Sequence, residues 1–437
     1  MKYKVKDILR LQVTPALGCT EPGAIALCAA AAASVMQGKD IESIELWVDP
    51  NIYKNGVAVT IPGTGGLSGL DTAAVLGALG GDPSLKLEVL DPIDSHVIEK
   101  AGEFLKAGKA KVNLLDQKGL YIKTLLKSGQ DTAMCVIRNM HDNIEKLAFN
   151  DTEITDSPLL SKVKEEGKSE VAEMEAWLKE LSLEELLKLI DDLDTEDLNF
   201  LDEGVHYNMR LAEFGLKNTS GLGVGMTLER LARQGFIKRD MILASRILTS
   251  AAADARMGGV KLPAMSSAGS GNHGLTAILP IRAVWDFVEI DKKVMLEAIA
   301  ISHIITAYIK SYTGRLSAVC GCSIAAGAGA TAGVTFLLGG GIHHITGAIK
   351  NLTEDLAGVV CDGAKPGCAL KLSTAAGTAV QAALFSLQGV RVEPTDGIIG
   401  TSTEQTIKNI GELSTLGMIE TDRTILKIML EKQFSGY

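Results

Sequence analysis

The sequence predicts an α+β protein in which a small α/β domain is joined to a large all-helical domain, with the active site between them. Two patterns in the 437 residues predict this fold class. Between residues 40 and 150, short apolar runs alternate with polar residues at a period of two, which is typical of half-buried strands. After Asn150 the strand signals almost vanish, and apolar residues recur at the spacing of amphipathic helices. No long Pro- or Ser-rich linker separates the two parts, so we expect both to contribute to one site.

Residues 1–40 are expected to form two short helices that carry Cys19 and pack on the helical domain. The first helix is predicted at Tyr3–Leu11 and the second at Pro22–Met36. Proline is favoured at the first position of a helix, and the preceding Thr20 strengthens the start signal. Cys19 therefore lies just before a helix N-terminus.

Residues 41–150 are expected to form the α/β domain, because the apolar pattern here changes repeatedly between the periods of strands and helices. The predicted strands are Ser43–Val48, Val57–Ile61, Lys111–Leu115, Tyr121–Leu126 and Thr132–Arg138. The predicted helices are Thr72–Leu79 and Ser95–Ala107.

Residues 151–437 are expected to form the helical domain. Its predicted helices are Lys168–Leu181, Leu183–Leu193, His206–Phe214, Arg239–Met257, Lys292–Ser311, Ser317–Leu338, His344–Val359, Ser373–Leu387 and Thr421–Gln433. The uncharged stretch Ser317–Gly341 is long enough to cross a bilayer. It is mostly Ala and Gly, carries Ser and Thr, and has no second spanning candidate beside it. We therefore predict a buried, closely packed helix rather than a membrane span.

Charge and cysteine content exclude several classes of protein. The formal charge of −10 disfavours a protein that neutralises a phosphate backbone, so no nucleic-acid partner is expected. The N-terminus lacks the apolar region and cleavage site of a secretory signal, which predicts a cytoplasmic protein without a membrane partner. Seven cysteines, an odd number, favour metal binding or catalysis over a disulfide framework.

Cys19 is the first candidate for chemistry. A cysteine at a helix N-terminus lies at the positive end of the helix dipole, which lowers the pKa of the thiol and favours the thiolate. Such a thiolate can act as a base or as a nucleophile. The alternative is a small buried residue that fills a tight turn. Cys28 and Cys135 lie in apolar helix and strand patterns and are expected to be core residues.

Two Gly- and Ser-rich segments are candidates for ligand binding. The loop 61–69 lies between a predicted strand and a predicted helix, and its backbone amides could hold a carboxylate or phosphate, although a tight turn without ligand is the alternative. The segment 265–274 gathers hydroxyl groups, an amide and the imidazole of His273 within ten positions. That density suits a small polar ligand, whereas His273 alone is more often a satisfied core or surface residue.

Four cysteines in the helical part form a third candidate. Cys320 and Cys322 lie near the start of one predicted helix, and Cys361 and Cys368 lie in a loop about 40 residues later. Three thiolates from such a loop and helix could hold an iron–sulfur cluster. The usual four-cysteine spacings are absent, so zinc and chance placement are alternatives.

Taken together and in order, these segments resemble the cysteine desulfidase family, which is related to the iron–sulfur type of L-serine dehydratase. The resemblance runs over nearly the whole chain and rests on the segments 14–22, 49–51, 54–56, 59–65, 254–259, 262–266, 269–272, 315–320, 361–364 and Cys368. His273 departs from the residue expected after Gly-Ser-Gly-Asn, so its role is open.

The resemblance implies a [4Fe–4S] cluster held by Cys320, Cys361 and Cys368, with one iron left open to the substrate. It also points to Cys19 as the catalytic base. Cys322 could replace Cys320 as a ligand, and only the block beginning at Arg315 favours Cys320. Residues expected to hold the carboxylate and amine of the substrate are Asn51, Lys54, Asn55, Gly63, Thr64, Gly65, Ser266, Ser267, Ser270 and Asn272.

The implied reaction is an α,β-elimination in which L-cysteine and water give pyruvate, ammonia and sulfide without pyridoxal phosphate (PLP). A small amino acid is the expected partner, and a homodimer is the candidate assembly. An L-serine dehydratase, in which hydroxide leaves, is the nearest alternative. A non-enzymatic metal- or amino-acid-binding protein is the alternative from another class.

Overall fold

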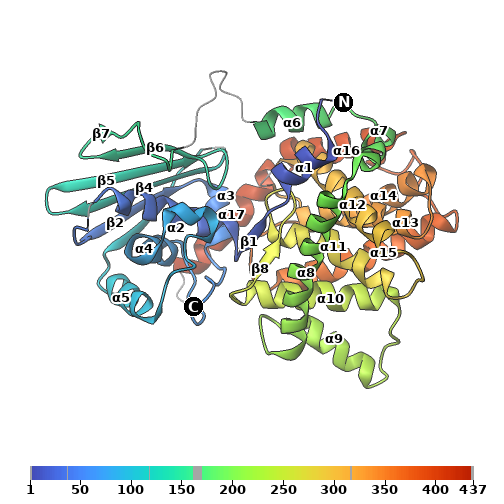
Figure 1. Ribbon diagram of the computed structural model, residues 1–437, viewed down its shortest axis with the longest axis horizontal. Coiled ribbons are helices and arrows are strands. Elements are labelled where there is room, and N and C mark those ends of the chain that lie inside the picture. Colours follow the sequence, from blue (N-terminus) through green and yellow to red (C-terminus); the bar gives the residue numbers. More distant parts are fainter. Residues whose placement is uncertain (1, 37, 118, 161–169, 315–316, 435–437) are drawn as a thin grey trace.

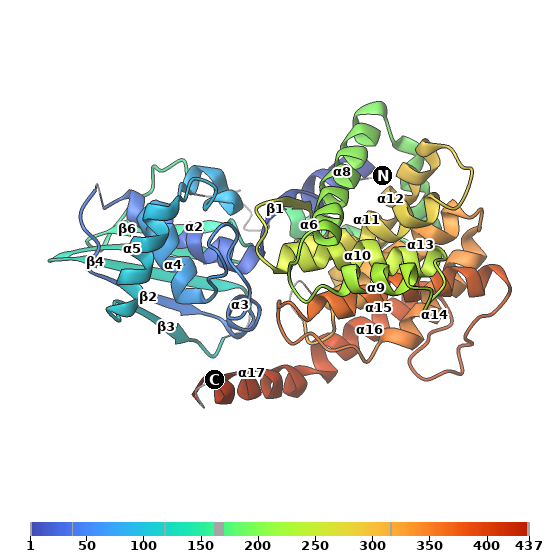
Figure 2. The same cartoon turned by 90° about the horizontal axis from the view of Figure 1, so that it is seen from below.

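The computed structural model describes the whole chain except residues 1, 37, 118, 161–169, 315–316 and 435–437. It confirms the α+β fold: a six-stranded mixed sheet with helices forms one lobe, and a larger lobe is almost entirely helical (Figure 1). The two lobes lie side by side, and the last helix reaches from the helical lobe beneath the α/β lobe (Figure 2).

The sheet of the α/β lobe has the strand order β3-β2-β4-β5-β6-β7. Its strands are β2 (Ser43–Val48), β3 (Ala110–Leu114), β4 (Tyr121–Ser128), β5 (Asp131–Arg138), β6 (Ile144–Phe149) and β7 (Thr152–Glu153). Only β2 and β3 pair in parallel, and the helical segments between them provide the long connection that parallel pairing requires. Burial alternates along β2, as the period of two predicts.

Helix α2 (Thr20–Ser34) packs beside α4 (Leu70–Gly80) on the sheet, with α5 (Ser95–Lys106) next to α4. The helices α2 and α4 approach closely, because a Cβ at Gly77 would lie only 2.2 Å from the carbonyl oxygen of Ala26. α2 belongs to the core of the α/β lobe, whereas α1 (Val5–Gln12) packs in the helical lobe. The expectation that both N-terminal helices pack on the helical domain is therefore wrong for α2.

The predicted strand Val57–Ile61 is also wrong. Helix α3 (Pro50–Gly56) precedes it, and the following segment forms only an isolated bridge between Thr60 and Ser68. Val59 and Ile61 are fully buried, so the apolar alternation does reflect burial. The backbone turns back on itself here, with the amide of Ile61 donating to the carbonyl of Leu67, and no strand ladder forms.

The helical lobe follows the prediction in most of its helices. Its helices are α6 (Glu170–Leu178), α7 (Leu183–Lys188), the 3₁₀ turn η2 (Leu189–Asp192), α8 (Thr195–Lys217), α9 (Val224–Arg233), α10 (Met241–Met257), α11 (Gly271–Trp285), α12 (Lys292–Thr313), the π-helical turn η3 (Cys322–Ala326), α13 (Gly327–Leu337), α14 (Ile342–Leu356), α15 (Cys368–Leu387), α16 (Thr403–Glu412), the π-helical turn η4 (Leu413–Gly417) and α17 (Ile419–Phe434). Residues 168–169 of the first predicted helix lie outside the described residues.

Two helix starts differ from the prediction in a way that affects the cysteines. The helix predicted from Ser317 begins only near the π-helical turn, so residues 317–320 are not helical. Helix α15 begins at Cys368, five residues earlier than predicted, so Cys368 lies in a first helical turn and not in a loop. Among the described residues, α12 and α15 are long and apolar enough to cross a membrane, yet most of each is buried in the structure.

A short antiparallel ladder joins the lobes near the site. Strand β1 (Pro15–Leu17), between α1 and α2, pairs with β8 (Pro263–Met265) of the helical lobe. The chain thus leaves the helical lobe through β1 and enters the α/β lobe at Cys19, the N-cap residue of α2. This crossing places Cys19 at the boundary between the lobes.

Candidate active site

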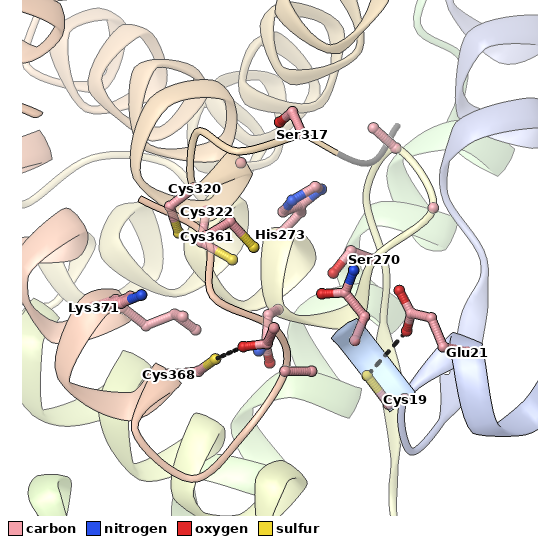
Figure 3. Close-up of a pocket in the computed structure, with 18 of the residues that line it drawn as sticks. Cys19, Glu21, Ser270, His273, Ser317, Cys320, Cys322, Cys361, Cys368 and Lys371 are labelled. Atoms are coloured by element: carbon pink, nitrogen blue, oxygen red, sulfur yellow. Dashed lines mark hydrogen bonds between the residues drawn. The ribbon is translucent and has the colours of Figure 1, made fainter. Parts of the chain in front are cut away.

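A pocket that is partly open to solvent lies where the two lobes meet. The α/β lobe contributes Cys19, Glu21, Asn55 and His141, and the remaining walls come from the helical lobe. Figure 3 shows Cys320, Cys322 and Cys361 close together on one side, with Cys19 and Glu21 across the pocket. The pocket therefore joins Cys19 and the four clustered cysteines, which the sequence places as far as 349 residues apart.

Two hydrogen-bonded segments bring Cys320 and Cys361 together. The amide of Cys320 donates to the carbonyl of Val359 at 2.9 Å, and the amide of Cys361 donates to the carbonyl of Ala318 at 2.6 Å. Val319 and Val360 form an antiparallel bridge between the same segments. Residues 315–316, which begin the sequence block that favours Cys320 over Cys322, lie outside the described residues.

The loop from Cys361 to Cys368 is held by charge and by close packing. Lys371 donates to the carbonyl of Val360 at 2.8 Å and also pairs with Asp362. Although partial burial opposes ionisation of Asp362, hydrogen bonds from Lys365 and Lys371 lower its pKa to about 2. Asp362 therefore stays ionised and fixes the loop that leads to Cys368.

Gly363 allows this loop to approach the other lobe. Its φ of +93° is a conformation that favours glycine, and a Cβ there would lie 2.1 Å from the carbonyl oxygen of Lys54 in α3. The thiol of Cys368 donates to the carbonyl of Gly363 at 3.7 Å. A larger residue at position 363 would therefore disturb both the lobe contact and the Cys368 thiol.

The four thiols influence one another's ionisation. The hydrogen bond from Cys322, assisted by Ser323 and Lys371, lowers the pKa of Cys320 to about 6 despite burial. Burial and the negative charge of Cys320 raise the pKa of Cys361, and burial raises that of Cys368 to about 11. The pKa of Cys322 is raised mainly by its hydrogen bond with Cys320, and burial adds to this effect. The four side chains are close enough to interact, and Cys320 is the thiol most easily ionised.

Cys19 lies at the predicted helix N-terminus, but its ionisation differs from the prediction. The side chain is only 8% exposed, and its thiol donates to Oε2 of Glu21 at 3.2 Å. Burial raises the pKa of Cys19 well above its usual range, and the negative charge of Glu21 adds to this effect. The helix dipole therefore does not yield a resting thiolate, and the prediction of a lowered pKa is wrong.

Glu21 connects Cys19 to a third buried side chain. The carboxylate also accepts a hydrogen bond from the hydroxyl of Thr20 at 3.2 Å. Nε2 of His141, from the turn between β5 and β6, lies 3.9 Å from Oε1 of Glu21. Glu21 thus lies between a thiol that faces the cysteines and an imidazole of the α/β lobe.

Some residues of the Ser-rich segment 266–272 line the pocket, and others hold the segment in place through hydrogen bonds. Ser270 and Asn272 line the pocket, as does His273. Ser266 instead accepts from the amide of Thr14 at 3.2 Å, and Oγ of Ser267 is 2.9 Å from Nδ1 of His303. The predicted residues Ser266 and Ser267 therefore hold the segment in place and do not line the pocket.

His273 is a neutral side chain in this structure. Its Nδ1 lies 3.2 Å from the carbonyl oxygen of Ser267, an acceptor, so Nδ1 carries the proton. Burial and the nearby charges of Lys310 and Arg256 lower the pKa of His273 to about 3. A Cβ at Gly321 would lie 2.4 Å from Nε2, so the unprotonated nitrogen faces the backbone between Cys320 and Cys322.

Several predicted ligand residues lie away from the pocket. The side chain of Thr64 donates to the carbonyl of Ile61 at 2.7 Å within its own loop, which agrees with a turn that binds no ligand. Gly63 and Gly65 in the same loop do not line the pocket either. Asn51 and Lys54 line a separate groove beside α17, where buried Lys54 pairs with Asp422. Of the three predicted ligand residues on α3, Asn55 lines the pocket.

The structure adds five charged or titratable residues that the sequence did not assign to the site: Glu21, His141, Arg256, Lys310 and Lys371. Glu21 and Arg256 occur inside the sequence segments that carry the family resemblance, so those segments contained the signal. Among the described residues, no group of three His, Cys, Asp or Glu side chains is arranged to hold a single metal ion.

Comparisons with known proteins agree with the resemblance. The sequence profile of the serine dehydratase alpha chain family matches residues 102–427. A UPF0597 protein of Desulfatibacillum aliphaticivorans is 63% identical over 437 residues and covers 100% of both chains. UPF0597 proteins of Desulfotalea psychrophila and Clostridioides difficile are 58% and 43% identical, covering 100% and 97% of this chain and 100% and 98% of theirs. The chain therefore belongs to the serine dehydratase alpha chain family and, with these relatives, to the UPF0597 family.

Proposed function

We propose that this protein is a cytoplasmic L-cysteine desulfidase, which converts L-cysteine and water to pyruvate, ammonia and sulfide without PLP. The observation that carries the proposal is the pocket in which Cys19 faces the thiols of Cys320, Cys322, Cys361 and Cys368. Elimination from an amino acid needs a base near the α-carbon and a group that assists departure of the β-substituent. In this proposal Cys19 acts as the base, and the clustered thiols on the other side of the pocket hold the group that assists departure of the β-substituent.

The chemistry of the thiols fits an iron–sulfur cluster. Cysteine thiolates are the usual protein ligands of such clusters, and these four lie on one side of the pocket and affect one another's pKa values. We assign Cys320, Cys361 and Cys368 as ligands of a [4Fe–4S] cluster, with Cys322 as the alternative to Cys320. A cluster held by these thiolates would supply a Lewis acid toward the substrate.

Cys19 and Glu21 supply the proton transfer in this proposal. The sulfur of Cys19 removes the α-proton while its own proton passes to Oε2 of Glu21, which already accepts its hydrogen bond. The Cα–H bond breaks, the S–H bond is renewed, and the electron pair expels the β-substituent. The aminoacrylate product then tautomerises and is hydrolysed to pyruvate and ammonia.

The nearest alternative is an L-serine dehydratase, and the match to the serine dehydratase alpha chain family favours it. The residues named above would act in the same way, with hydroxide instead of sulfide as the leaving group. Turnover of L-serine and L-cysteine separates the two enzymes.

Anaerobic purification followed by iron analysis tests the proposal. We expect brown protein with about four irons per chain and pyruvate formation from L-cysteine at a higher kcat/KM than from L-serine. A higher value for L-serine would support the dehydratase. Colourless protein with stoichiometric zinc, or an iron protein that binds amino acids and forms no pyruvate from either one, would contradict the proposed enzyme.

Replacing Glu21 with Gln tests the pairing of Glu21 with Cys19. The amide can still accept the thiol's hydrogen bond, but it removes the negative charge that helps to raise the pKa of Cys19. We expect that pKa to fall, so iodoacetamide should label Cys19 faster at pH 8, while elimination should decrease by about 10²-fold.

Mass spectrometry of the peptide that contains Cys19 gives the labelling rate. Cys28, which is buried in the core of the α/β lobe, serves as the internal control. Slower labelling of Cys19 together with slower turnover would mean that Glu21 only supports the local fold. Faster labelling with normal turnover would remove Glu21 from the proton transfer.

A further inference from the structure

Arg256 is a buried cation in the pocket for which the structure shows no ion pair. The side chain, in the last turn of α10, is 2% exposed. Its Nη1 donates to Oδ1 of Asn272 at 2.9 Å, and its Nη2 donates to the carbonyl of Gly18. Among the described residues, Nε is buried without a hydrogen-bond partner, and the two hydrogen bonds that the guanidinium makes go to neutral oxygen atoms. Burying a guanidinium without a neighbouring anion costs free energy of folding. A negatively charged partner at this position would offset that cost.

The guanidinium lies against the N-terminus of α11. A Cβ at Gly271, the first residue of this helix, would be 2.4 Å from Nε of Arg256, so glycine is needed there. The side chain of Ser270, the N-cap residue, makes no capping hydrogen bond. Amides at a helix N-terminus attract anions, and here they adjoin a buried cation with an unpartnered N–H. Two independent features thus favour an anion at the same point.

We propose that Arg256, together with Asn272 and the N-terminus of α11, forms the subsite for the α-carboxylate of the substrate. This inference rests on the proposed function, in that it takes the substrate to be an α-amino acid. An arginine fork matches the two oxygens of a carboxylate, and the unpartnered N–H of Nε lies beside Gly271 at the helix terminus.

The position of this subsite fits the rest of the pocket. Because Arg256 is bonded to Gly18, a carboxylate held there lies beside Cys19, and the adjacent α-carbon comes within reach of its sulfur. The β-substituent can then point toward the cysteines on the other side. A fixed carboxylate, a base beside the α-carbon and a separate site for the β-substituent provide the three contacts that distinguish an L-amino acid from its mirror image.

The competing explanation is that Arg256 only ties Gly18 to Asn272. Equilibrium binding of two unreactive compounds separates the explanations: L-alanine carries the α-carboxylate and has no leaving group, whereas L-alaninamide lacks the carboxylate charge. Both are measured by calorimetry with the anaerobic holoenzyme. We expect wild-type protein to prefer L-alanine, and Arg256→Gln to bind L-alanine about 10- to 100-fold more weakly with little change for L-alaninamide.

Arg246→Gln is the matched control. Arg246 lies on the same helix and also has a buried Nε without a partner, but it does not line the pocket. It should leave both affinities unchanged. Arg256→Lys keeps the charge without the fork and should retain part of the preference, which provides a second variant if Arg256→Gln folds poorly.

The possible outcomes are distinct. An unchanged preference for L-alanine in both Arg256 variants, or an equal loss of the two ligands, would overturn the carboxylate subsite and leave the proposed function standing. Wild-type protein that binds neither compound would overturn the proposed function, and the subsite with it.

Discussion

Replacing Cys361 or Cys368 with Ala is expected to abolish iron retention and with it all elimination activity. Cys361 is fixed by its backbone bond to Ala318, and Cys368 by the first turn of α15, so neighbouring thiols cannot move into their places without rebuilding both segments. Loss of one of three ligands leaves a cluster without a stable site. Iron content and visible absorption after anaerobic reconstitution measure the effect.

The same measurement decides between Cys320 and Cys322. We expect Cys320→Ala to lose iron and Cys322→Ala to retain it, and the reverse result would show that Cys322 is the ligand. Cys28→Ala and Cys135→Ala are the controls. The thiol of Cys28 donates to the carbonyl of Cys135 at 3.3 Å in the core of the α/β lobe, so these variants should change stability and not iron content.

Cys19→Ala is expected to keep the cluster and to bind amino acid, yet to lose elimination by about 10²-fold or more, the scale for removal of a general base. Cys19→Ser should also be slow, because a hydroxyl is a much weaker acid than a thiol and would pass its proton to Glu21 far less readily. Solvent exchange gives a direct reading: in deuterated water, wild-type enzyme should introduce deuterium at the α-carbon of unreacted substrate, and Cys19→Ala should not.

Normal turnover by Cys19→Ala would return this residue to the role of a small residue in a tight turn. His273 is then the next candidate for the base, because it lines the pocket and its Nε2 carries no proton. Lys54, the other candidate, is paired with Asp422 outside the pocket and would have to break that ion pair.

The sequence predicts the elements of this fold well where a regular apolar period coincides with burial. Strand β2 begins and ends at the predicted residues, α12 begins as predicted and ends two residues later, and α17 differs by two residues at its start and one at its end. Helix α11 is absent from the prediction because it contains Pro280 and starts with glycine, two features that normally disfavour helices. Tertiary packing, which buries nearly the whole of α11, outweighs them.

Some residues of the candidate site can be identified from the sequence, and others only from the structure. The cysteines are recognisable because they occur in the ordered sequence blocks that carry the resemblance, and the segment containing Asn272 because it gathers hydroxyl, amide and imidazole groups within ten positions. Arg256 and Glu21 also lie in segments that carry the resemblance, but a charged residue in a sequence is usually exposed, so only the fold shows that these two are buried in the pocket. The predicted low pKa of Cys19 is wrong for the same reason: the helix terminus is visible in the sequence, whereas the burial of the thiol and the Glu21 carboxylate beside it are visible only in the structure.

The passage of the chain through β1 makes the α/β lobe an insertion into the helical lobe. Helix α1 belongs to the helical core, the chain then builds the sheet and its helices, and it returns for α6 and the helices that follow. Every thiol of the four-cysteine cluster comes from the host lobe, whereas Cys19 and Glu21 arrive with the insertion. The four-cysteine cluster and the Cys19–Glu21 pair are thus encoded in separable parts of the polypeptide, so either part can change during evolution while the other stays intact.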